Sequence, residues 1–158
     1  MSVLGLIAGG AVFVVALAGS TGGDWVQDYP HEILSPGEPG RIIRALKAHG
    51  VHEVLLCGRV DRPKFSEMKL DAKGMLLLPK AIAAAKKGDD ALLRFIVGIC
   101  EDEGLVALSV AEAAPGLVCR DGAVGAMTPS PDHRADIAAA FAIVRALGAL
   151  DVGQAAVV

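Results

Sequence analysis

A glycine pair at the front of the chain is the first feature that could do chemistry. Gly9 and Gly10 follow the apolar run "SVLGLIA", residues 2–8. Glycines directly after a strand let backbone N–H groups come close to a phosphate. The stretch "GLIAGG" has neither the spacing of the dinucleotide fingerprint nor that of the P-loop. The pair therefore indicates backbone that suits a phosphate, without naming the ligand.

Charged side chains follow another predicted strand, residues 52–58. Arg59, Asp61, Arg62 and Lys64 stand directly after it, in "RVDRPKF". In open α/β sheets, ligands gather at the carboxyl ends of the strands, so these residues are placed to bind one. A solvated, charged surface loop accounts for their position equally well.

Two adjacent acids begin the predicted helix of residues 89–104. Asp89 suits the N-cap, and Asp90 falls in the first turn, where a carboxylate interacts favourably with the helix dipole. On the pattern alone, capping is therefore favoured over catalysis for both acids.

The histidines and cysteines form no metal or nucleophile motif. The four histidines make no HxH or HExxH pair, and the chain has no G-x-S-x-G. The histidines are His31, His49, His52 and His133. The cysteines, which are widely spaced and odd in number, are Cys57, Cys100 and Cys119. Their pattern favours buried, reduced thiols in a cytosolic protein.

The opening 23 residues carry no charge and allow three interpretations. The run is about long enough for a membrane span, although it is rich in glycine. A secretory signal has support from "ALAGS", which looks like a cleavage site, but no Lys or Arg precedes Arg41. Two short buried strands, residues 2–8 and 11–18, fit best, since continuous apolar runs are typical of strands covered on both faces.

The connection between these two strands raises a geometric problem. Only Gly9 and Gly10 separate them, whereas a parallel pair needs a crossover of roughly a dozen residues. The pair is therefore either a hairpin, or a crossover helix is missing from the sequence.

The remaining pattern predicts one α/β domain. Apolar periodicity and stop signals predict helices at residues 41–50, 76–88, 89–104 and 132–150, the last one capped by Asp132, with strands at 105–113 and from 151. Residues 19–40 are predicted to form a long polar loop. The chain is 53% hydrophobic and only 4% aromatic, and its net charge of -3 gives no reason to expect nucleic acid as a partner. The expected fold is α/β and Rossmann-like, with an open, mostly parallel sheet and helices on both faces.

Five stretches, taken in order, resemble one family, the LpxI-type UDP-2,3-diacylglucosamine pyrophosphatases of lipid A synthesis. They are "LGLIAGG", "GRVDRPKF", "KKGDDALLR", "TPSPDHRADI" and "LDVGQAAVV". The resemblance implies an enzyme, peripheral to the cytoplasmic face of the inner membrane of a Gram-negative bacterium. It would use a divalent cation such as Mg²⁺ to hydrolyse the pyrophosphate of a UDP-activated diacylated glucosamine. The products would be UMP and 2,3-diacylglucosamine 1-phosphate, and the family allows a homodimer.

The chain departs from the family in two places. Family members usually carry a helix between the glycine-rich turn and the second strand, and a second domain with the main catalytic acid. Residues 1–150 would then be the N-terminal domain, and residues 151–158 the start of a linker or strand into a C-terminal catalytic domain. The fragment by itself is expected to be inactive.

The resemblance also implies roles for individual residues. Backbone at Gly9 and Gly10 would approach a phosphate, and Arg62 would pair with phosphate or uridine-side oxygens. Asp89 or Asp90 could order a metal-bound water. The remaining substrate-side residues would be Lys87, Gly88, Arg94, Thr128, Pro129 and Asp132, with Asp151 and Gln154 at the domain junction. Arg94 could instead pair with Asp90 four residues earlier.

Two other functions remain open on the sequence. One is a nucleotide- or phosphate-binding α/β module with no chemistry of its own. The other is a secreted or membrane-anchored protein led by the apolar N-terminus.

Overall fold

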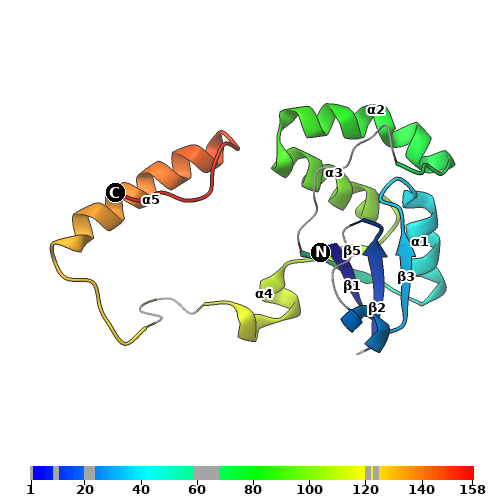
Figure 1. Ribbon diagram of the computed structural model, residues 1–158, viewed down its shortest axis with the longest axis horizontal. Coiled ribbons are helices and arrows are strands. Elements are labelled where there is room, and N and C mark those ends of the chain that lie inside the picture. Colours follow the sequence, from blue (N-terminus) through cyan, green and yellow to red (C-terminus); the bar gives the residue numbers. More distant parts are fainter. Residues whose placement is uncertain (1, 9–10, 20–23, 59–67, 120–121, 123–124) are drawn as a thin grey trace.

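A five-stranded sheet forms the centre of the computed structural model, which describes residues 2–8, 11–19, 24–58, 68–119, 122 and 125–158. The strand order is β3-β2-β1-β4-β5 (Figure 1). The strands are β1 (Ser2–Ala8), β2 (Ala11–Leu17), β3 (His31–Leu34), β4 (Glu53–Gly58) and β5 (Val106–Leu108). The opening apolar run thus forms two strands, as predicted, and not a helical membrane span.

Four of these strands run in one direction and the central strand β1 runs in the other. β2 is parallel to β3 and β4 is parallel to β5, while β1 is antiparallel to both of its neighbours, β2 and β4. The open α/β sheet is confirmed, and β1 and β2 form the hairpin that was one of the two interpretations of their short connection. The expectation of a mostly parallel, Rossmann-like sheet is therefore met only in part, since β1 pairs antiparallel on both sides. The physical reason is the connection: two residues can join antiparallel neighbours but cannot make a parallel crossover.

The helical elements follow the predicted pattern in most places. They are η1 (Asp24–Asp28), α1 (Pro39–Ala48), α2 (Ala72–Lys87), α3 (Asp89–Asp102), α4 (Val110–Ala113), η2 (Pro115–Leu117) and α5 (His133–Ala149). The four predicted helices are confirmed as α1, α2, α3 and α5. Helix α2 begins four residues earlier than predicted because Asp71 caps it.

Three predictions of local structure are wrong. The predicted loop of residues 19–40 contains η1, β3 and the start of α1. The predicted strand of residues 105–113 ends at Leu108, because a capping box between Ser109 and Glu112 starts α4. Residues 151–158 form turns and irregular chain rather than a strand.

The core lies mainly between the sheet and two helices on one of its faces. Phe13 and Val15 of β2 pack there with Leu46 of α1 and Cys100 of α3. On the opposite face, Val14 and Ala16 are covered by Val26 of η1. Among the described elements, α-helices therefore cover one face and a 3-10 helix the other, so the prediction of helices on both faces is only partly met.

The C-terminal helix stands apart from this core. α5 lies away from the sheet, and its C-terminal end approaches the turn between α2 and α3 (Figure 1). None of its residues is fully buried. Among the helices in the described ranges, none is both long and apolar enough to cross a bilayer.

Candidate functional site

The carboxyl ends of β2, β3, β4 and β5 share one edge of the sheet, because these four strands run the same way. This is the edge at which open α/β sheets bind ligands. The predicted phosphate-side residues Arg59, Asp61, Arg62 and Lys64 follow Gly58, the last residue of β4, but lie outside the described residues. Gly9 and Gly10, which also lie outside them, follow the carboxyl end of β1. Because β1 is antiparallel to β2, that end lies at the opposite edge of the sheet, where Ala8 pairs with Ala11. The described residues at this edge include residues 35–38, which follow β3, and residues 68–71, which precede α2 and contact them.

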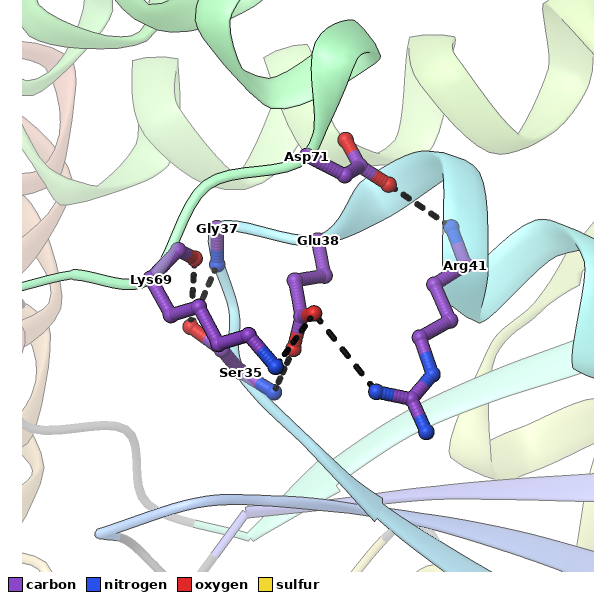
Figure 2. Close-up of polar contacts among 6 residues, drawn as sticks. All are labelled: Ser35, Gly37, Glu38, Arg41, Lys69 and Asp71. Carbon is purple, nitrogen blue, oxygen red and sulfur yellow. Dashed lines mark hydrogen bonds and ion pairs between the residues drawn. The ribbon is translucent and has the colours of Figure 1, made fainter.

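A polar cluster joins these two loops (Figure 2). The Ser35 hydroxyl donates to the Lys69 carbonyl oxygen at 2.9 Å, and the Ser35 N–H donates to Glu38 Oε2 at 3.2 Å. Glu38 Oε1 pairs with Lys69 Nζ at 3.3 Å and with Arg41 Nη1 at 3.6 Å. These contacts fix the loop after β3 to the chain that enters α2.

Glu38 is the most enclosed acid of this edge, with only 6% of its surface exposed. Burial by itself would raise its pKa. The Ser35 N–H and the cations Lys69 and Arg41 outweigh that effect and lower the pKa of Glu38 below its ordinary value. Glu38 is therefore an ionised carboxylate with several partners. This suits a role in holding the two loops together better than a role in proton transfer.

Asp71 caps two helices at once. Its Oδ1 accepts from the Gly74 N–H of α2 at 2.7 Å, and its Oδ2 accepts from the Arg41 N–H of α1 at 2.8 Å. The Asp71 N–H donates to the Gly37 carbonyl oxygen at 3.2 Å. Asp71 is not among the residues predicted above, although an aspartate directly before an apolar helical run is an N-cap signal.

Replacing Asp71 with alanine is expected to destabilise the protein by about 2 kcal/mol, because the variant loses an N-cap and a second hydrogen bond. Asp71→Asn keeps one acceptor oxygen, so it should lose about half as much. Urea denaturation monitored by circular dichroism measures both variants. Equal stability of Asp71→Ala and the unaltered protein would contradict the double-capping role.

A second polar cluster joins the C-terminal ends of α1 and α3 to the first turn of α2. Glu103, after α3, pairs with Lys47 of α1 at 2.6 Å and with Lys73 of α2. Arg44 lines the same open pocket of about 420 Å³. Hydrogen bonds from Lys47 and Lys73 lower the pKa of Glu103 to about 2. The three cations outnumber the two carboxylates that line the pocket, Glu103 and Asp71, so the pocket has a net positive character.

Replacing Glu103 with glutamine is expected to reduce stability at neutral pH and to have little effect in strong acid. A carboxyl whose pKa is lower in the folded state stabilises the fold above its unfolded pKa, and this contribution is lost as the pH falls through the folded pKa. The difference between the two proteins should therefore shrink between pH values of about 4.5 and 2. Urea midpoints across this range measure it, with Glu101→Gln as the exposed control. A difference that does not vary with pH would contradict the role.

The turn between α2 and α3 brings several predicted site residues together. Gly88, with a φ of 139°, is the N-cap of α3, so Asp89 is the first helical residue and not the predicted cap. Arg94 Nε pairs with Asp90 Oδ2 at 2.7 Å, the i,i+4 contact that the sequence allowed. Lys87 is the last residue of α2 and flanks this turn. The Asp90 N–H also donates to Asp151 Oδ2 at 3.3 Å.

Asp151 reaches this turn from the end of α5. Its φ of 54° places it in the left-handed region. Its N–H and that of Val152 donate to Gly148 and Leu147 carbonyl oxygens, as in a Schellman motif. A side chain on Gly88 would overlap the Asp151 carboxylate. A protein carboxylate therefore occupies the N-terminus of α3, the position that was predicted to face a substrate.

The other predicted residues lie elsewhere. Thr128, Pro129 and Asp132 precede α5, and α5 spans about 25 Å by its rise per residue. Asp132 therefore lies at the opposite end of α5 from Asp151 and is not brought to the α2–α3 turn. Its predicted capping bond is absent, since its side chain accepts no N–H of the helix. Gln154 lines a separate pocket of about 360 Å³ along α5.

Metal ligands do not gather in the described part of the chain. No group of three or more His, Cys, Asp or Glu side chains there could hold a metal ion.

The burial of the three cysteines differs from the prediction: Cys100 is buried, whereas Cys57 and Cys119 are exposed. The predicted burial of all three is therefore wrong for two of them.

Two comparisons with known proteins bear on this arrangement. The model of the LpxI N-terminal domain family matches residues 4–117. The UDP-2,3-diacylglucosamine pyrophosphatase LpxI of Caulobacter vibrioides is 39% identical over 173 aligned positions, which cover 100% of this chain and 62% of that relative. The chain thus spans less than two thirds of the relative's length. The chain belongs to the LpxI family, and residues 4–117 correspond to its N-terminal domain.

Proposed function

We propose that this chain is the N-terminal, substrate-binding part of an enzyme that hydrolyses the pyrophosphate bond of UDP-2,3-diacylglucosamine. The products would be UMP and 2,3-diacylglucosamine 1-phosphate (lipid X), in lipid A synthesis. The observation that carries the proposal is the 39% identity, over the whole chain, to a relative named as a pyrophosphatase for this substrate. We place the main catalytic acid in the part of that relative that the chain does not match.

The substrate phosphates would lie along the carboxyl edge of the sheet. Arg62 would pair there with phosphate oxygens in bidentate fashion. Gly9 and Gly10 would offer backbone N–H groups at this edge only in a relative whose β1 runs parallel to β2, because Ala8 pairs here with Ala11 at the amino end of β2. The α2–α3 turn, with Lys87 and Gly88, would form a second binding surface. The Asp90 carboxylate pairs with Arg94, and this contact favours a structural role for both over a catalytic one.

The remaining predicted residues form a third group in this proposal. Thr128 and Asp132 would meet the substrate only if it, or the rest of the protein, extends along α5. Gln154 would lie at the junction with the C-terminal catalytic domain, beyond residues 1–150. Asp89 would order a water next to the scissile phosphate.

Mg²⁺ belongs to the proposal for the whole enzyme. When bound, the ion would neutralise charge that builds on the pyrophosphate during attack by water. The described residues do not fit a Mg²⁺ site, since they bring no three suitable ligands together. We therefore expect its ligands elsewhere in the full protein.

The proposed substrate also indicates where in the cell the enzyme would act. A diacylated sugar nucleotide resides at a membrane, so the enzyme would act as a peripheral protein on the cytoplasmic face of the inner membrane. A homodimer is a further expectation from the family.

We propose that the longer relative has a Rossmann-like fold. The alignment extends over 173 positions although this chain has 158 residues, so the relative carries residues where this chain has none. We infer that some of them form a crossover between β1 and β2. Such a crossover would allow β1 to run parallel to the other four strands.

A second candidate function is a nucleotide- or phosphate-binding module without hydrolytic activity. It is favoured by the lack of a three-ligand metal cluster in the described ranges. UMP release from UDP-2,3-diacylglucosamine separates the two candidates, assayed with this chain and with a protein of the relative's full length. We expect EDTA-sensitive release from the longer protein only. No release from the longer protein would overturn the hydrolase proposal, and EDTA-sensitive release from this chain would exclude the binding module.

A further inference from the structure

An apolar cavity lies between helices α1, α2 and α3. Its volume is about 170 Å³, more than ten times the roughly 10–15 Å³ that one water molecule needs. The walls come from Ile42 and Ile43 of α1, from Leu78 and Ala81 of α2, and from Phe95 of α3. Nearly all of the surrounding side chains are hydrocarbon, so the cavity suits the apolar part of a ligand.

The helices around this cavity are packed loosely for such an apolar sequence. Among the cavity residues of α2 and α3, only Gly74 and Cys100 are fully buried. Ile96, which also lines the cavity, is 36% exposed. Apolar surface that remains accessible in this way would gain stability from an apolar occupant.

One end of the cavity meets the polar edge of the sheet. Gly37 and the flanking residues Met68 and Leu70 line the cavity, while Lys69 between them pairs with Glu38. Figure 2 shows Lys69 together with Glu38 and Ser35, beside Gly37. The Lys69 side chain is 71% exposed and can reach an anionic group at the same place. The arrangement combines an apolar chamber with a charged rim, which matches an amphiphile.

We propose that this cavity binds an acyl chain of the diacylated substrate, with the sugar phosphate at the Lys69 rim. This inference rests on the proposed function, because the acyl chains are known only from the substrate in the relative's name. Each methylene group that enters such a cavity should raise affinity about fourfold. Affinity should stop rising when the chain fills the cavity.

Binding of saturated fatty acids to the 158-residue chain tests the proposal without any hydrolysis assay. The probes are octanoate, decanoate, dodecanoate and tetradecanoate, measured by displacement of a fluorescent fatty acid. We expect saturable binding that tightens with chain length. Ala81→Phe, which fills the cavity, should weaken dodecanoate binding at least about tenfold. Ala83→Phe, on an exposed position of the same helix, should leave it unchanged.

A second variant covers the case in which Ala81→Phe does not fold, as judged by circular dichroism. Leu78→Ala enlarges the cavity, so it should increase the preference for tetradecanoate over dodecanoate by about fourfold. Absence of saturable binding would overturn the proposal. An equal loss of dodecanoate affinity in Ala81→Phe and Ala83→Phe would also overturn it. So would the finding that the protein is a dimer which Ala81→Phe converts to a monomer without changing fatty-acid binding.

The two proposals fail in distinguishable ways. If fatty acids bind as expected but the longer protein releases no UMP, the cavity proposal survives as an acyl site in a binding module. If UMP is released but Ala81→Phe affects substrates of every acyl length equally, the cavity instead packs against another part of the protein.

Discussion

Replacing Gly74 with alanine is expected to destabilise the protein by about 3 kcal/mol. Gly74 is buried in the first turn of α2, and a methyl group there would overlap the Gly37 carbonyl oxygen. The overlapped atom is backbone, so it can move only if the loop after β3 separates from α2. That separation would also strain the Asp71 N–H bond to the same carbonyl oxygen.

Gly98→Ala is the matched control for this prediction. Gly98 lies inside α3, and no atom lies within 4 Å of the position that its Cβ would take. Alanine should therefore stabilise the helix by about 1 kcal/mol, the ordinary difference between the two residues. Urea denaturation of both variants should show shifts of opposite sign. A neutral or stabilising effect of Gly74→Ala would mean that α2 and the loop after β3 are not in close contact.

Replacing Leu46 with alanine is expected to cost about 2 to 5 kcal/mol, the usual range for a buried leucine. Leu46 of α1 is 0% exposed and packs in the main core with Phe13, Val15 and Val54. The truncation leaves a cavity between α1 and the sheet that rigid neighbours cannot close. Thermal unfolding should shift by roughly 2–4 °C for each kcal/mol lost.

Leu76→Ala provides the control for the same chemical change. Leu76 of α2 is 77% exposed, so its truncation should change stability by no more than about 0.5 kcal/mol. A small effect of Leu46→Ala, similar to that of Leu76→Ala, would show that α1 does not form the core against the sheet.

Local patterns in the sequence determined much of the secondary structure. The apolar periodicity predicted α1, α2, α3 and α5, and the continuous apolar runs predicted β1, β2 and β4. The i,i+4 spacing of Asp90 and Arg94 also indicated their ion pair. These features depend on residues within about one or two helical turns, so one stretch of sequence contains their cause.

Short elements escaped because their local signals were weak or competing. β3 has only four residues inside a stretch rich in Pro and Gly, and it forms because its backbone pairs with β2. Residues 110–113 have an apolar, strand-like start, but the Ser109–Glu112 capping box makes them helical. The segment after Asp151 lacks a strand partner in the described part of the chain, so its apolar residues line a pocket beside α5.

The tertiary structure alone decided how the candidate site is built. Asp71 reaches Arg41 across 30 positions, and Glu103 meets Lys47 across 56. The apolar cavity needs three helices and two loops to come together. No periodicity encodes such contacts, because they depend on how separate elements pack after each has formed. The sequence alone was therefore sufficient to predict the family and most of the helices and strands. The direction of β1, the capping of both α1 and α2 by Asp71, and the apolar cavity depend on packing and could be found only in the structure.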